Sequence, residues 1–309
     1  MVFSIIIVNY NLSYNVIDSI KSLLSFVKGQ EYEMIIVDND SHQAEKDILK
    51  KEINTIPQVK LCFLDSNKGF GAGNNFGFEK ANGDILFLLN PDTIITRNIF
   101  NQVEKIFNSY SEVSVLGPKI VNEQNVQEKS AGKFPNLLSE FLNIFFISRH
   151  IEKKYFNSKE KKTSNGFVEV DWITGSAMFI RRSVFKNTGG FDTNFFMYSE
   201  EIDLCKRIKD SGGKIVYYPD VELVHKGSVG SKKNYFFFTK TSYESKYYYI
   251  KKHFKGLEKF LIICFLKIQI ILQLIIWTML FSFNPPKSAG KLKAFGKLLF
   301  SSRISESNK

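Results

Sequence analysis

Apolar runs alternate with amphipathic segments along the first 120 residues of the chain. Five apolar-rich segments predict strands: FSIIIVNY (3–10), EMIIVDND (33–40), QVKLCFLD (58–65), DILFLLNPD (84–92) and VSVLGPKIV (113–121). Such runs are typical of parallel strands that are covered on both faces. The segments between them have helical spacing, as in LSYNVIDSIKSLLSFV. This alternation predicts βαβ units and a mainly parallel α/β sheet flanked by helices.

The pattern is less regular after residue 124. Residues 125–167 mix apolar and lysine-rich pieces, and we interpret them as an insertion between the regular elements. Regular signals return at FVEVDWITGSAMFIRRSVF, which predicts a strand, a glycine turn, another strand and a short helix. SEEIDLCKRIKDSGG predicts a helix that its glycines end. KIVYYPD and VELVH predict two short strands.

The most apolar run of the chain lies near its end, at residues 260–283. As a helix it would be about 36 Å long, enough to cross a bilayer. Lysines flank it on both sides, and positive charge prefers the cytoplasmic side of a membrane. We therefore expect a helix that lies in the membrane interface or re-enters it. A buried helix of the soluble part or a dimer contact is the alternative.

Charge is distributed unevenly along the chain. Residues 226–309 contain 16 Lys and Arg against three Asp and Glu, whereas residues 1–225 carry a net −2 of the total +11. Basic charge beside the most apolar run favours an anionic membrane surface and argues against a nucleic-acid partner. No secretory signal is recognisable in MVFSIIIVNYN. We therefore expect a cytoplasmic protein that is peripheral on the inner face of the cell membrane.

The chain has three cysteines, which are odd in number and widely spaced (Cys62, Cys205 and Cys264). No Cys-x-x-Cys pair occurs among them. They indicate buried thiols of a reducing compartment rather than a disulfide framework or a zinc site.

Four of the predicted strands end in Asn or Asp. These exits are Asn9-Tyr10-Asn11, Asp38-Asn39-Asp40, Asp65-Ser66-Asn67 and Asn90-Pro91-Asp92. Ligands of parallel sheets bind at the carboxyl ends of the strands, so the exits predict a cleft for a polar ligand. The alternative is that these residues only cap the helices that follow.

A glycine-rich segment with Gly69, Gly71, Gly73 and Gly77 follows the third predicted strand. It is similar to the dinucleotide-binding fingerprint, but Phe76 stands where that pattern needs Gly or Ala. The segment also follows the third strand rather than the first. A nicotinamide-dependent oxidoreductase therefore stays an alternative. Free amides at the start of a helix would also suit a diphosphate.

Three side chains are candidates for catalysis or metal binding. Asp92 stands behind Pro91, which fixes the backbone, and a carboxylate there suits a hard divalent cation shared with substrate phosphates. Glu201 continues the apolar stripe of its helix, so we expect it to point inward as a general base while Glu200 points elsewhere. His225 ends a strand and could bind metal or diphosphate. The alternatives are a simple turn at Asp92 and a helix-dipole partner at Glu201.

Seven motifs, in this order, resemble the family-2 inverting glycosyltransferases of the GT-A fold. They are IIIVNYN, IIVDNDS, NKGFGAGNNFG, LLNPDT, WITGSAMFIRRSVF, GGFDTNFFMYSEEIDLCKR and VHKGS. The rhamnosyltransferase-like members, which build bacterial surface polysaccharides, are the most similar. The resemblance implies a GT-A (Rossmann-like) domain at residues 1–250, with a nucleotide-sugar half (1–120) and an acceptor and catalytic half (121–250). Residues 251–309 would form a basic, apolar, helical membrane-associating tail.

The resemblance also implies a role for each matching position. Contacts to the nucleotide and donor would come from Val8, Asn9, Tyr10, Asp38, Asn67, Lys68, Gly69, Asn75 and Asn90. Contacts to the donor and acceptor sugars would come from Trp172, Gly175, Ser176 and Glu200. Glu201 matches the catalytic base, and Asp92 and His225 match the ligands of Mg²⁺ or Mn²⁺. Asn90 departs from the family pattern, which often has an acid there, and so does Glu201, which replaces Asp.

The implied activity is the inverting transfer of a sugar from a nucleotide-diphosphate donor, with dTDP-L-rhamnose as the expected donor. The acceptor would be a glycan or a polyprenyl-diphosphate-linked glycan. Glu201 would take the proton of the acceptor hydroxyl while the nucleoside diphosphate leaves. A non-catalytic sugar-nucleotide or glycan-binding protein is a further alternative to the oxidoreductase. A homodimer is left open.

Overall fold

The computed structural model describes residues 1–145, 166–227 and 234–300, and these form two compact units. The described parts of the α/β unit are residues 1–134, 166–193 and 200–227. Those of the helical unit are residues 135–145, 194–199 and 234–300. The insertion expected at residues 125–167 lies largely outside the described residues. The expected functional boundary at residue 250 stays a prediction.

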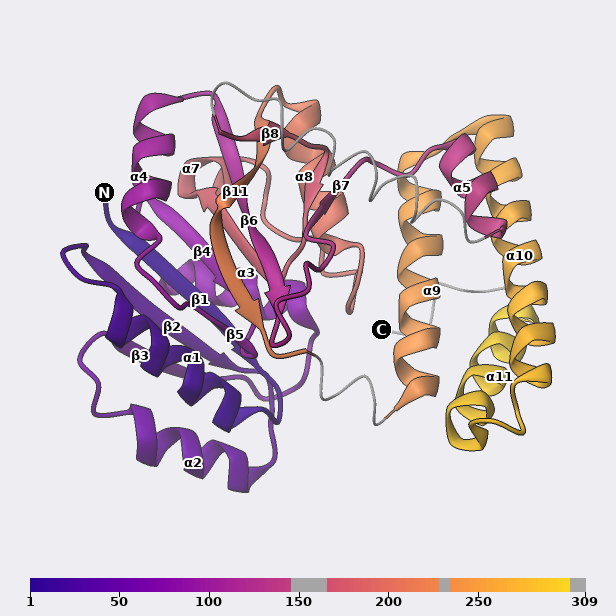
Figure 1. Ribbon diagram of the computed structural model, residues 1–309, viewed down its shortest axis with the longest axis horizontal. Coiled ribbons are helices and arrows are strands. Elements are labelled where there is room, and N and C mark those ends of the chain that lie inside the picture. Colours follow the sequence, from indigo (N-terminus) through magenta and orange to yellow (C-terminus); the bar gives the residue numbers. More distant parts are fainter. Residues whose placement is uncertain (146–165, 228–233, 301–309) are drawn as a thin grey trace. The chain divides into compact units, whose positions relative to one another are not determined.

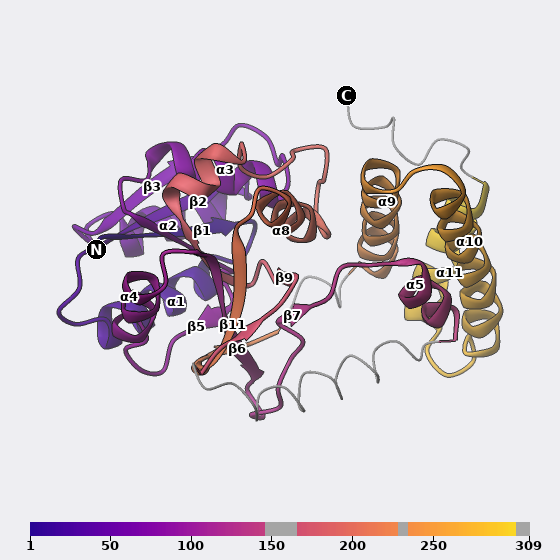
Figure 2. The same ribbon diagram turned by 90° about the horizontal axis from the view of Figure 1, so that it is seen from above.

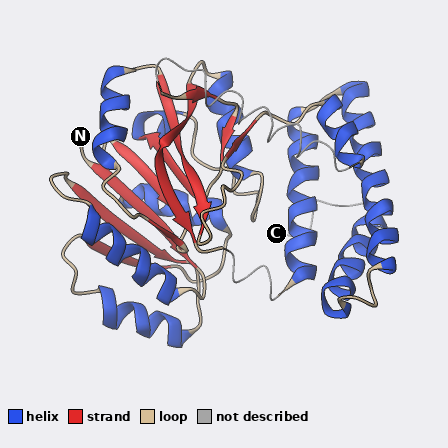
Figure 3. Cartoon of the chain, viewed as in Figure 1, coloured by secondary structure: helices blue, strands red, loops and turns tan. Residues whose placement is uncertain are grey.

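The α/β unit contains a mixed, mostly parallel sheet with helices on both faces (Figures 1 and 3). Its strand order is β3 (Val59–Phe63), β2 (Tyr32–Asp38), β1 (Phe3–Asn9), β4 (Ile85–Leu89), β10 (Ala177–Arg181), β6 (Val113–Asn122), β11 (Lys214–His225) and β5 (Thr93–Ile94), and β8 (Val168–Glu169) pairs with β11. The first three strands and β4 are parallel, and β10 runs antiparallel between β4 and β6. The predicted fold class and the five predicted strands are confirmed. The two strands expected after residue 213 are instead one strand, β11, with an irregular register between Tyr218 and Glu222.

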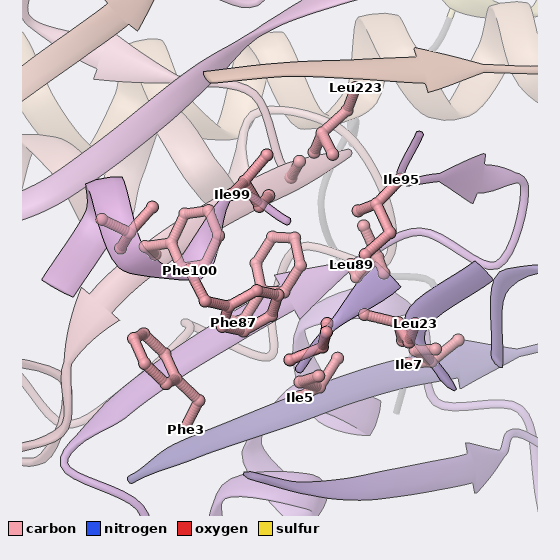
Figure 4. Close-up of a cluster of buried hydrophobic side chains, with 14 of the residues drawn as sticks. Phe3, Ile5, Ile7, Leu23, Phe87, Leu89, Ile95, Ile99, Phe100 and Leu223 are labelled. Carbon is pink, nitrogen blue, oxygen red and sulfur yellow. The ribbon is translucent and has the colours of Figure 1, made fainter. Parts of the chain in front are cut away.

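The main core lies between one face of this sheet and the helices that cover it. These helices are α1 (Ser13–Phe26), α2 (Gln43–Ile53) and α4 (Phe100–Ser109). Alternate residues of β1, from Phe3 to Ile7, point into this core because successive side chains of a strand face opposite sides (Figure 4). The Phe87 and Phe179 rings stack there with their centroids 3.9 Å apart.

Helix α3 (Phe70–Lys80) packs on the opposite face, through its glycines. A Cβ atom built on Gly77 would lie 2.5 Å from Cγ2 of Ile6, and one on Gly73 would lie 2.7 Å from Cγ1 of Val8. Both distances are far shorter than a van der Waals contact. The glycines one turn apart therefore let the helix approach β1 closely. This packing explains the glycine-rich segment without a dinucleotide, so the oxidoreductase alternative is not favoured.

The helical unit consists of α5 (Leu137–Ile144), α9 (Tyr235–His253), α10 (Gly256–Met279) and α11 (Pro285–Phe300) (Figure 2). Ile262, Leu266 and Ile270 form the inner face of α10 and pack against residues of α9 and α11. Residues 194–199 also belong to this unit. The hydroxyl of Ser245 on α9 donates a 2.7 Å hydrogen bond to the Met197 carbonyl, and the rings of Phe195 and Tyr248 lie 4.7 Å apart.

Of the three cysteines, only Cys205 is fully buried, and its burial raises the pKa of the thiol to about 12. Cys62 and Cys264 are half-buried, so the expectation of three buried thiols is wrong for these two. Cys62 lies on β3, whose residues are mostly half-buried because β3 is the edge strand of the sheet.

Candidate active site

Buried hydrogen bonds join the carboxyl ends of β1 and β2. Asn9 and Asp38, which are fully buried and opposite each other in the parallel register, are linked by a 2.8 Å bond from Asn9 Nδ2 to Asp38 Oδ2. The other Asp38 oxygen accepts a 2.9 Å bond from the backbone N–H of Ser41. Val8 packs against α3, whereas Tyr10 is 47% exposed. The structure thus gives Asn9 and Asp38 a role in shaping the exits, and their contact with a nucleotide stays a prediction.

Asn39, which we did not include among the site residues, holds the next loop in place. Its Nδ2 donates to Oδ1 of Asn67 (2.9 Å) and to the carbonyl of Gly69 (3.1 Å), and its Oδ1 accepts from the N–H of Lys68 (3.1 Å). One side chain therefore organises three of the positions that are predicted to contact the nucleotide, Asn67, Lys68 and Gly69. The polar triplet Asp38-Asn39-Asp40 already contained this signal, because a buried amide after a strand needs several partners.

Asn75 on α3 connects this helix to the loop that follows α7 (Arg182–Asn187). Its amide donates to the Phe191 carbonyl and accepts from the Phe191 N–H, both at 2.9 Å. Arg207 holds the same loop through the carbonyls of Thr188 and Gly190, and it pairs with Asp203 at 2.9 Å. Asp203 and Arg207 are four positions apart, the spacing at which side chains face each other on a helix. Asn75 fixes the loop, and its contact with the donor sugar stays a prediction.

Asp92, His225 and Glu128 form a line of charged side chains at the carboxyl edge of the sheet. His225 ends β11 and pairs in register with Thr93 of β5, which places its Nε2 3.2 Å from Oδ1 of Asp92. Its Nδ1 lies 2.8 Å from Oε2 of Glu128. Burial lowers the pKa of His225, but the contacts with Asp92 and Glu128 outweigh it and raise the pKa to about 9. The imidazole is therefore a cation at neutral pH.

Asp92 and His225 could supply part of a site for a metal cation. Asp92 is 6% exposed, and its Oδ1 accepts no properly aligned hydrogen bond from any residue that the structure describes. The 3.2 Å between that oxygen and Nε2 of His225 is close to the spacing of neighbouring ligands in an octahedral shell with bonds of about 2.1 Å. Bound Mg²⁺ or Mn²⁺ would require His225 to lose its proton, and Glu128 would then orient the ring.

This pair alone does not complete a metal site. Among the described residues, no group of three or more His, Cys, Asp and Glu could hold a metal ion. The remaining ligand positions would therefore belong to donor phosphates and water, as is usual for Mg²⁺. Asn90, where the family often has a second acid, contributes its backbone N–H to the Ser176 carbonyl at 2.9 Å.

Trp172, Gly175 and Ser176 lie on β9 (Trp172–Ile173) and on the turn to β10. The Trp172 ring is 8% exposed, and its Nε1 donates a 3.0 Å hydrogen bond to the Lys133 carbonyl on the segment after β7 (Ala131–Gly132). A Cβ atom on Gly175 would lie 3.0 Å from the Phe70 ring and 4.0 Å from Cβ of Glu201. The turn therefore passes directly beside the candidate base, and the lack of a side chain at Gly175 lets the Phe70 ring approach it closely.

Glu200 and Glu201 begin α8 (Glu200–Asp210), but their orientation differs from the prediction. Glu200 is 4% exposed, with Asp203 and Leu204 on the same buried stripe, whereas Glu201 is half-buried. The expectation that Glu200 points elsewhere is wrong. Leu204 is four residues from Glu200 and three from Glu201, so both satisfy the helical spacing and the sequence alone could not separate them.

The two carboxyl groups influence each other's protonation. Burial, together with the negative charge of Glu201, raises the pKa of Glu200 well above its usual value. Oε2 of Glu200 is buried and accepts no hydrogen bond within the described part of the chain. Glu200 therefore keeps its proton to a higher pH than an ordinary glutamate does. The negative charge of Glu201 opposes a second charge on Glu200, since two close carboxylates cannot both ionise easily.

Comparison with known proteins identifies the family. The model of "Glycosyl transferase family 2" matches residues 4–189, more than half of the chain. The chain belongs to glycosyl transferase family 2. The expectation of an enzyme with a glycosyltransferase fold is confirmed, and the non-catalytic alternative is set aside.

Two curated relatives of this glycosyltransferase are named as rhamnosyltransferases. Rhamnosyltransferase WbbL of Escherichia coli is 28% identical over 219 residues, which cover 67% of this glycosyltransferase and 78% of WbbL. The N-acetylglucosaminyl-diphospho-decaprenol L-rhamnosyltransferase of Mycobacterium tuberculosis is 24% identical over 216 residues, 65% of this chain and 69% of the relative.

A solved structure shows that the fold is shared more widely. The mannosyltransferase PcManGT from Pyrobaculum calidifontis, in complex with GDP-Man and Mn²⁺, superposes with a TM-score of 0.59 at 13% identity, covering 96% of this glycosyltransferase and 87% of PcManGT. At this identity the likeness concerns the fold alone, which confirms the mostly parallel sheet of the GT-A type.

Proposed function

We propose that this glycosyltransferase moves L-rhamnose from dTDP-L-rhamnose to a glycan carried on a polyprenyl diphosphate, with inversion at the anomeric carbon. Two rhamnosyltransferase relatives support the sugar, and the name of the mycobacterial relative states a diphospho-decaprenol acceptor. The observation that carries the proposal is chemical. One compact unit holds a buried Asp92–His225 pair at the strand ends and two adjacent carboxyl groups at the start of α8, of which the buried Glu200 has a raised pKa.

On the donor side, the chain supplies charge for the diphosphate. The loop that Asn39 organises at residues 67–69 and the Asp92–His225 pair follow strands whose carboxyl ends share one edge of the sheet. Mg²⁺ or Mn²⁺ bound by Asp92 would neutralise the charge that develops on the leaving nucleoside diphosphate. Before the ion binds, a protonated His225 would supply positive charge to the same phosphates, and after the ion binds, the neutral ring would be its second protein ligand.

On the acceptor side, Glu201 removes the proton. The acceptor oxygen forms a bond to the anomeric carbon as the bond to the diphosphate oxygen breaks, and the acceptor proton passes to the carboxylate of Glu201. Glu200 retains its own proton, because its pKa is raised, so it does not compete as the base. A single displacement of this kind inverts the anomeric configuration.

The helical unit would bind the membrane surface. Among the described residues, α10 is the helix that is long and apolar enough to cross a membrane, with a mean hydropathy of 2.4 over its most apolar window, and 17% of that window is buried. Leu257, Phe260, Ile268, Ile271, Ile275 and Met279 are exposed along it. Because its opposite face is packed against α9 and α11, we propose that α10 lies in the interface rather than spanning the bilayer.

The proposal is tested by transfer of labelled rhamnose from dTDP-L-rhamnose to a synthetic N-acetylglucosaminyl-diphospho-polyprenol. Glu201→Gln should lower the rate by about 10²- to 10⁴-fold, the usual contribution of a general base, and leave donor binding unchanged. Glu79→Gln, an exposed site on α3, is the control. Undiminished transfer by Glu201→Gln would remove Glu201 from the mechanism, and no transfer by the unmodified protein from any nucleotide-sugar donor would refute the function.

A further inference from the structure

The helical unit contains a pocket of about 420 Å³, and Tyr198 is the one lining residue that belongs to a motif of the sequence analysis. Residues from α9, α10 and α11, together with Tyr198, surround it. Its lining consists of Tyr198, Tyr235, Phe238, Thr239, Ser242, Tyr243, Gln273, Lys287, Lys291 and Phe295. The volume is within the usual range for small-molecule sites, and the lining combines aromatic rings with hydroxyl groups.

The charged side chains that line the pocket are all positive. Two lysines and no carboxylate line it, so the lining carries a formal charge of +2. Of the three acids among the described residues of the helical unit, Glu140 pairs with Lys246 and Glu244 pairs with Lys240. The third, Glu258, lies 15 residues before Gln273 on α10, about 22 Å along the helix axis. The pocket therefore favours an anion.

The two lysines are held in place by the helices around them. They are one turn apart on α11, and the ammonium groups of Lys287 and Lys291 lie 5.4 and 4.4 Å from the centre of the Trp277 ring. Gly290, between them, lets α11 approach α9 closely, since a Cβ atom there would lie 3.0 Å from Cβ of Tyr235. Both lysines are half-buried, so less ordering is needed when a ligand binds.

We infer that this pocket binds the phosphate-bearing head group of a membrane lipid. Two ammonium groups and several hydroxyls are donors suited to phosphate oxygens. The same unit carries the apolar exposed stripe of α10, which a lipid surface would cover. A polyprenyl diphosphate is the head group that we favour, and this part of the inference rests on the proposed function. Tyr198 also precedes Glu201 by three residues, so a short stretch of chain joins the pocket to the candidate base.

The test compares two double variants of the full chain on the same helix. Lys287→Gln/Lys291→Gln removes the pocket charge. Lys293→Gln/Lys297→Gln, with the same spacing and the same loss of charge at exposed positions outside the pocket, is the control. Geranyl diphosphate binding is measured by calorimetry in EDTA with excess dTDP, which keeps the ligand away from the donor site. The pocket variant should bind at least about 10-fold more weakly, which corresponds to 1.4 kcal/mol, and the control within 2-fold.

A second experiment, co-sedimentation of the same variants with phosphatidylglycerol vesicles, distinguishes a carrier lipid from a phospholipid as the ligand. A selective loss for geranyl diphosphate supports a carrier-lipid site, and a selective loss for the vesicles supports a phospholipid head-group site. Equal losses in both double variants, or no binding of either lipid by the unmodified protein, would overturn the inference. Ser242→Phe, which fills the pocket without changing its charge, should weaken binding as well. A protein that binds geranyl diphosphate but no nucleotide sugar would contradict the proposed function and leave this site standing.

Discussion

The raised pKa of Glu200 leads to a measurable dependence of stability on pH. The unfolded chain releases this proton near pH 4.5, whereas the folded protein retains it to much higher pH. Folding stability therefore falls as pH rises above 4.5, by about 1.36 kcal/mol per unit, until the folded pKa is reached. Glu200→Gln, which has nothing to ionise, should lack this loss.

The expected size follows from that slope. Between pH 5.0 and 6.5 the unmodified protein should lose stability relative to Glu200→Gln, at a rate of at most about 1.36 kcal/mol per pH unit, the slope for one proton that only the folded chain retains. For a unit of this size, each 1 kcal/mol lost corresponds to a fall in melting temperature of about 2–4 °C. The upper limit of pH 6.5 avoids the range in which His225, with its pKa of about 9, would add a similar loss.

The assay can observe the α/β unit alone. The chain has two tryptophans, Trp172 in the α/β unit and Trp277 in the helical unit. In a Trp277→Phe background, urea denaturation followed by fluorescence therefore reports on the unit that contains Glu200. Glu79→Gln, at an exposed position, should parallel the unmodified protein. Parallel pH curves for Glu200→Gln and the unmodified protein would refute the assignment of a neutral Glu200.

Three further predictions concern other parts of the chain. Asp92→Asn should lower the pKa of His225 from about 9, as measured by NMR titration, and an unchanged pKa would contradict the ion pair. The same variant should abolish any increase in melting temperature that Mn²⁺ causes in the presence of the donor. Gly77→Ala should lower the free energy of unfolding, measured by urea denaturation, by about 1–3 kcal/mol, because the added Cβ would clash with β1. Gly296→Ala on α11, where no atom lies within 4 Å of the added Cβ, should instead raise it by about 0.5–1 kcal/mol. An unchanged stability of Gly77→Ala would exclude the close packing of α3 on β1. Ile271→Asp should weaken binding to anionic vesicles at least several-fold without changing donor binding, measured by co-sedimentation, and equal binding would exclude the exposed face of α10 as the membrane surface.

Much of the fold could be predicted because strand and helix periods are local properties of the sequence. The apolar runs gave the five strands, and the order of strands and helices gave the α/β class. The Asp92–His225 contact could be anticipated only as two candidates at strand ends. Their 3.2 Å separation depends on the pairing of β11 with β5, which joins residues more than a hundred positions apart.

Other features depended on three-dimensional packing that the sequence does not display. The deeper burial of Glu200 depends on how α8 packs against the elements around it, which helical spacing alone does not fix. The role of Asn39 could not be predicted, because it depends on residues 67–69 lying next to the end of β2, which only the three-dimensional structure shows. The packing role of the α3 glycines was not among the explanations that we considered from the sequence, because it depends on the approach of Ile6 and Val8 from β1.

The attachment of residues 194–199 to α9 has a consequence for the synthesis of the protein. This six-residue segment immediately precedes Glu200, yet its anchors, Ser245 and Tyr248, are made some fifty residues later. A ribosome that has just released the α/β sequence has therefore not yet supplied the groups that hold the start of α8. The two candidate carboxylates would be set only after α9 has left the ribosome. The enzyme should thus stay inactive during translation until the unit that we propose to bind the membrane begins to form.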